Sequence, residues 1–150
     1  MATHLPIQAL NRQYLALLDI CDVLEAVADG LPNNVSLDQC SRLAIEIVDL
    51  LERAHREEEL LLLPLLASSP RPEVRHLAER LRREHDYDNE AVIEVREALL
   101  AIATQRPLRS ADATGYLLRS FFESLRRHVQ AEQDLLALLS DLVPQSGALN

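Results

Sequence analysis

Apolar residues recur at steps of three and four along four long stretches of the chain. Side chains spaced in this way share one face of an α-helix, so each stretch predicts an amphipathic helix with its apolar face turned toward a core. Segments rich in Pro, Gly, Asn and Ser separate the stretches and mark turns. The predicted helices are Pro6–Ala28, Leu37–Leu66, Pro72–Thr104 and Ser110–Leu142.

Local signals mark the ends of the second and third predicted helices. Ser36 precedes the second helix and Gln39 follows three residues later, which is a capping-box pattern. Pro72 begins the third helix, where a first-turn residue has no amide hydrogen bond to lose, whereas the ring of Pro64 should end or kink the second helix near its last turn. Four amphipathic helices with short connections predict an all-α fold, an antiparallel up-down-up-down four-helix bundle, with residues 1–150 forming a single domain.

Composition narrows the class of protein and its partners. Apolar residues make up 48% of the chain but aromatic residues only 3%, so the core must consist of Leu, Ile, Val and Ala, which favours helices. The formal net charge is −9 without a basic stripe, which argues against nucleic acid and anionic membranes as partners. Cys21 and Cys40 form no CxxC motif and are expected to be free thiols. With no signal peptide or membrane span expected, a cytoplasmic protein is predicted.

Polar residues interrupt the predicted apolar faces near the middle of the helices. Two helices each carry a His-x-x-x-Glu pair, whose side chains project from one face and can bind one cation together. A carboxylate buried without a partner costs several kcal/mol, so such groups at one level of a core need a common partner, which a pair of cations supplies. The candidate metal ligands are Tyr14, His55, Glu59, His85, His128 and Glu132.

Several alternatives remain open at these positions. Asp88, one turn after His85, is a further ligand, a hydrogen-bond partner for an imidazole, or a charge at the end of the bundle. Mixed imidazole and carboxylate ligands suit iron, manganese or zinc. A second hypothesis is a metal-free helical interaction module whose inward polar groups hydrogen-bond to one another. A hydrolytic zinc enzyme fits poorly because the chain has no His-Glu-x-x-His motif.

The order of these residues along the chain resembles the hemerythrin-like (HHE cation-binding) family. That family has a His on the first helix, His-x-x-x-Glu on the second, His on the third and His-x-x-x-Glu on the fourth. The matching residues are His55, Glu59, His85, His128 and Glu132, together with an acidic run that leads to a proline over residues 57–66. The resemblance covers nearly the whole chain.

Two departures from the family pattern bear on the ligand set. Tyr14 stands where the family has its first-helix histidine, and its position in the heptad points it inward. Either Tyr14 binds as a phenolate, or the site loses a ligand and holds a single ion. Pro64 follows His55 one residue sooner than the family pattern leads us to expect, which leaves open whether Glu58 or Glu59 completes the second-helix pair.

The resemblance implies a non-haem di-iron centre, oxo- or hydroxo-bridged, with manganese or zinc as less favoured metals. Such a centre binds or reacts with dioxygen, nitric oxide or peroxide, or senses or stores iron. A phenolate from Tyr14 would favour the ferric state, and therefore peroxide or redox chemistry over reversible oxygen carriage. The choice between carrier, sensor and enzyme stays open, as does the oligomeric state.

Overall fold

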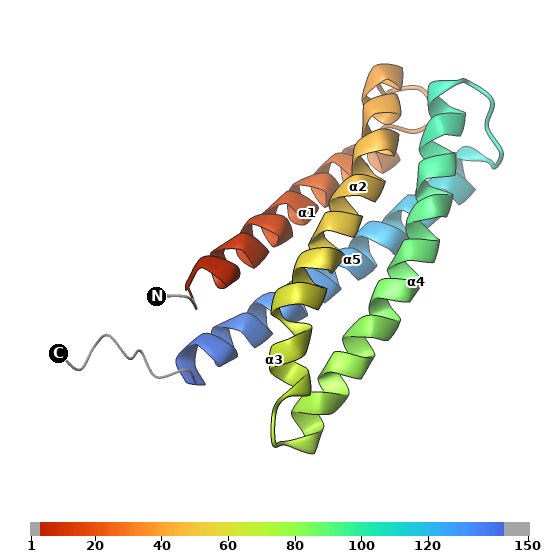
Figure 1. Ribbon diagram of the computed structural model, residues 1–150. Helices are drawn as coiled ribbons and strands as arrows, with labels where there is room; N and C mark the ends of the chain where they lie inside the picture. The colour runs from red at the N-terminus through yellow and green to blue at the C-terminus, as the bar shows by residue number, and fades with distance from the viewer. Residues whose placement is uncertain (1–3, 143–150) are drawn as a thin grey trace.

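The computed structural model describes residues 4–142, and all of its regular structure in this range is helical. Four long helices and one short helix follow each other as α1 (His4–Gly30), α2 (Leu37–Leu61), α3 (Leu63–Ala67), α4 (Pro72–Ala103) and α5 (Ala111–Leu142). Each long helix runs antiparallel to the long helix before it (Figure 1). The predicted all-α four-helix bundle is therefore confirmed. None of the described helices is long and apolar enough to cross a membrane.

The bundle is built from two helix pairs that cross at an angle. Helix α1 packs along α5, and α2 packs along α4, with the short α3 continuing toward the start of α4 (Figure 1). Between the two pairs, the contact of α1 with α2 is intermediate in extent. The contact of α4 with α5 is the smallest of those between long helices. The α4–α5 side is therefore the most open side of the bundle.

The helix ends follow from the local sequence. The Gln39 backbone N–H donates to Ser36 Oγ at 3.2 Å, as the capping-box pattern predicts. Pro72 occupies the first turn of α4. Pro64 interrupts the second predicted helix, which ends at Leu61 and resumes as α3 with the proline in its first turn, where the missing N–H costs nothing.

Aliphatic side chains fill the core, as the composition predicts. Buried leucines lie one helical turn before and after the polar residues at the centre of the bundle, which encloses those residues between apolar layers. These leucines are Leu10, Leu17, Leu51, Leu62, Leu81, Leu125 and Leu136. Cys21 and Cys40 are buried and free, in agreement with the prediction of free thiols.

Candidate metal centre

Polar side chains from all four long helices gather in the middle of this apolar core. They are Tyr14 from α1, His55 and Glu58 from α2, His85 and Asp88 from α4, and His128 and Glu132 from α5. All are buried except His128, which is partly buried. The sequence therefore brings residues up to 118 positions apart (14 to 132) to one level of the bundle, as expected for positions on the inner helix faces.

Glu58, His85 and Glu132 form the tightest group in the cluster. One ligand atom from each lies within 4.8 Å of the others, and His85 Nε2 lies 3.0 Å from Glu58 Oε2. The two carboxyls are hydrogen-bonded to each other. Burial raises the pKa of both, and the negative charge of Glu58 raises the pKa of Glu132 further. Without a cation the pair must therefore keep a proton that two exposed carboxylates would release.

Asp88 joins the remaining histidines into a second group beside the first. Its Oδ2 lies 3.2 Å from Nδ1 of His128 and 3.9 Å from Nε2 of His55. The other nitrogen of His55, Nδ1, lies 3.0 Å from Asn89 Oδ1, to which it donates. The lone pair of His55 Nε2 and the Asp88 carboxylate thus face each other, which is an arrangement that a cation between them would satisfy.

The two groups touch through their imidazole rings. His55 stacks on His85 with ring centroids 4.0 Å apart and an interplanar angle of 17°. Burial, with the nearby His85 ring, lowers the pKa of His55 to about 4, so this imidazole is neutral and keeps a lone pair at neutral pH. The hydrogen bond to Asp88 instead raises the pKa of His128. A neutral imidazole is the form that binds metal ions.

Tyr14 supplies the clearest sign of a missing partner. Its side chain is fully buried, and among the described residues its hydroxyl has no hydrogen-bond partner. Burial raises the pKa of Tyr14, and the charges of Glu58 and Glu132 raise it further. An unsatisfied buried hydroxyl costs about 1–3 kcal/mol. A cation bound by Glu58 and Glu132 would provide the partner, so the donor set fits a metal ion.

Of the two α2 carboxyls between which the sequence left a choice, the structure turns Glu58 inward and not Glu59, the residue named in the predicted ligand set. The Glu59 side chain is 57% exposed, whereas that of Glu58 is 2% exposed. The buried stripe of α2 runs through Ile47, Leu51 and Ala54 at steps of four and three, and the next step of four reaches Glu58. Glu59 lies about 100° further around the helix, and its Oε1 reaches only within 3.6 Å of His85 Nδ1 from the surface. Glu58 therefore replaces Glu59 as the inward carboxyl of α2.

Two residues that contact the histidines of the cluster, Asp88 and Asn89, had weaker signals in the sequence. Asp88 is a carboxylate bonded to an imidazole, one of the alternatives stated for it, and it continues the inward steps of α4 between His85 and Val92. Asn89 was not predicted. It is exposed and lies off the inner face, so only the contact with His55 reveals its role.

An antiparallel four-helix bundle that encloses histidines and carboxylates from three of its long helices, with a tyrosine from the fourth, is a helical protein with a candidate cation site at its centre. The chain matches the model of the Hemerythrin HHE cation binding domain over residues 5–139 and belongs to this family. The resemblance expected from the order of the ligands is thereby confirmed. No curated protein and no solved structure matches the chain.

Proposed function

We propose that this chain is a non-haem iron protein that holds a pair of iron ions and reacts with peroxide or a diatomic molecule such as dioxygen or nitric oxide. The observation that carries the proposal is the meeting of Glu58, His85 and Glu132 within 4.8 Å, in a core that also buries a Tyr14 hydroxyl with no hydrogen-bond partner among the described residues. Family membership supports cation binding. Imidazole mixed with carboxylate oxygens is a donor set typical of non-haem iron sites.

Each residue of the cluster has a distinct part in this proposal. Glu58, His85 and Glu132 would hold one ion beside Tyr14, and His55 and His128 would hold the second with Asp88. Iron at this place would supply a one-electron redox change and an open coordination position. The stacking of His55 on His85 and the hydrogen bond that His55 donates to Asn89 fix the ring orientations in advance. The leucine layers above and below restrict solvent.

Tyr14 directs the proposal toward redox chemistry over reversible carriage of dioxygen. A phenolate is a hard anionic donor that stabilises the ferric state. The Tyr14 hydroxyl must release its proton to bind, and its pKa is raised in the metal-free protein, so binding through this oxygen is coupled to proton release. Tyr14 is fully buried, and its hydroxyl is within the influence of the charges of Glu58 and Glu132.

Metal analysis tests the proposal directly. Protein from iron-supplemented cells is analysed for metal per chain, and its absorption spectrum is recorded before and after reduction. We expect bound iron and a coloured oxidised form that fades on reduction. Glu132→Gln should lower the iron content strongly, whereas Glu123→Gln, on the exposed face of α5, should leave it unchanged.

The same experiment distinguishes the metal centre from a metal-free role. If the purified chain binds neither iron nor manganese nor zinc, the proposal is wrong. The cluster would then be a hydrogen-bonded polar core, as in the alternative of a helical interaction module. The His85–Glu58 and His128–Asp88 contacts exist without a metal ion, but they leave the Tyr14 hydroxyl unsatisfied among the described residues.

A further inference from the structure

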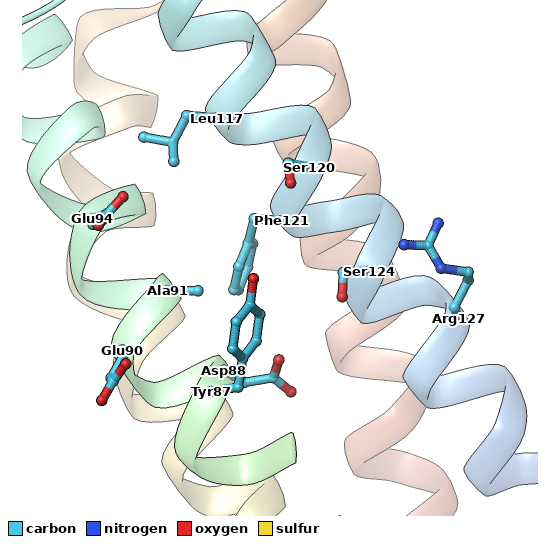
Figure 2. Close-up of a pocket in the computed structure, with 10 residues that line it drawn as sticks. All are labelled: Tyr87, Asp88, Glu90, Ala91, Glu94, Leu117, Ser120, Phe121, Ser124 and Arg127. Atoms are coloured by element: carbon cyan, nitrogen blue, oxygen red, sulfur yellow. The ribbon is translucent and has the colours of Figure 1, made fainter. Parts of the chain in front are cut away.

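A groove of about 340 Å³ lies between α4 and α5, on the side where the bundle is most open. Ala91 faces it from α4, and Ser120 and Ser124 face it from α5. These small side chains leave the space between the helices unfilled. Figure 2 shows the Tyr87 ring standing beside Phe121 in this space. Tyr87 is 66% exposed, so its ring lines the groove on the solvent side and is not packed into the core.

The inner end of the groove is part of the candidate metal centre. Asp88 lines the groove although its side chain is only 7% exposed, and it bonds to His128 at 3.2 Å. The His128 side chain is 22% exposed, compared with 9% for His55 and 4% for His85. His128 is therefore the most exposed imidazole of the cluster, and it is bonded to Asp88, which lines the groove.

Charge along the groove favours cations. Glu90 and Glu94 line its α4 side, and Asp88 adds a third carboxylate at the inner end. Arg127 is the one base among the lining residues. Negative side chains beside a narrow opening raise the local concentration of cations and their rate of arrival.

We propose that the α4–α5 groove is the access route by which a divalent cation reaches the buried cluster, with Ala91 and Tyr87 setting its width. This inference rests on the proposed metal centre, because it supplies that centre with its ion. A hydrated cation would pass Glu94 and Glu90, exchange water for the Asp88 carboxylate, and then meet the imidazole of His128.

Substitutions that close and open the groove should change the rate of metal uptake in opposite directions. Metal-free protein is mixed with Co²⁺, and the growth of the cobalt absorption band is followed by stopped flow. Ala91→Trp should slow uptake by about tenfold, because access would then wait for local opening of the helices. Tyr87→Ala should speed uptake. The amount of Co²⁺ bound at the end should equal that of the unmodified protein in both variants.

Matched variants separate the groove from general effects on stability. Ala26→Trp adds the same bulk on the exposed face of α1, and Tyr116→Ala removes an exposed ring from α5 outside the groove. Both should leave the uptake rate unchanged. Glu90→Gln combined with Glu94→Gln should slow uptake about two- to fivefold at low salt and less at high salt, whereas Glu97→Gln should not.

The outcomes distinguish this inference from the proposed function. If the unmodified protein takes up no Co²⁺, the metal centre itself is wrong. If the unmodified protein binds Co²⁺ while Ala91→Trp and Tyr87→Ala bind it at the same rate, the centre stands and the access route is overturned. Should Ala91→Trp fail to fold, Tyr87→Ala still decides the question, because an exposed ring can be removed without disturbing the core.

Discussion

At the scale of single residues, the Tyr14 hydroxyl can be examined with and without metal. Tyr14→Phe removes a buried oxygen that lacks a partner among the described residues. The metal-free variant should therefore be as stable as the original or more stable by about 1 kcal/mol in urea denaturation. In the oxidised iron protein the same change should abolish the phenolate-to-iron absorption band. An unchanged band would rule out coordination by Tyr14.

The neighbouring glutamates of α2 provide a matched pair of variants. Glu58→Gln removes a buried carboxylate of the cluster, so it should lower metal affinity by about 10- to 100-fold or more. Glu59→Gln changes a side chain that is mostly exposed and should leave affinity within about twofold. Competition with a chelator of known affinity measures both. A larger loss in Glu59→Gln than in Glu58→Gln would reverse the assignment made from the structure.

Much of the candidate site could be predicted from spacing alone. The exception is the choice between Glu58 and Glu59, which has a simple geometric cause. Tyr14, His85 and Glu132 each interrupt a clear apolar stripe, and all are buried in the structure. Glu58 and Glu59 lie on either side of the direction of His55, because three residues give −60° and four give +40° around a helix. Only the packing of α2 against its neighbours decides which carboxyl turns inward.

At the scale of helices, the positions of the long elements were predictable because their signals are local. Ser36 and Pro72 begin α2 and α4 where the sequence predicts. The break at Pro64 was predicted, but the separate helix α3 that follows it was not. A five-residue helix has too few positions to show a period, so its form depends on packing against α4.

The end of α4 offers a test of backbone strain. Gln105 follows the helix with φ of 58°, a left-handed conformation that side chains other than glycine rarely adopt. Gln105→Gly should raise the free energy of unfolding by about 0.5–1 kcal/mol in urea denaturation. Arg106→Gly, at the next residue in an ordinary conformation, should give no gain, because glycine there only adds freedom to the unfolded chain. Equal effects in both variants would contradict this explanation.

At the scale of the whole molecule, the buried carboxyls tie stability to pH. The pKa values of Glu58 and Glu132 are raised, so the folded protein keeps protons that the unfolded chain releases above about pH 4.5. His128, whose pKa is also raised, acts in the same direction. His55, whose pKa is lowered to about 4, acts in the opposite direction only up to about pH 6.5. Above pH 6.5 these groups together reduce stability as the pH rises.

Metal-free protein should therefore become less stable between about pH 6.5 and 8, with a slope of up to about 1.4 kcal/mol per pH unit for each proton released. Urea denaturation at several pH values measures the slope. Replacing both Glu58 and Glu132 by Gln should flatten it. Saturating metal should also remove the loss, because the ionised carboxylates are the form that binds. A stability that rises with pH in the metal-free protein would contradict the buried, protonated pair.

The two crossed helix pairs give a bound cation a mechanical effect as well as a chemical one. The segments that connect the pairs, residues 31–36 and 104–110, lie at one end of the bundle, and the pairs diverge toward the other end (Figure 1). The inward donors come from both pairs. In the described residues, the backbone connects the two helix pairs at one end of the bundle only. A bound cation would therefore add a second connection between the pairs. Removal of the metal should widen the distribution of distances between the two helix pairs at the end opposite these connections, while the helix content stays unchanged.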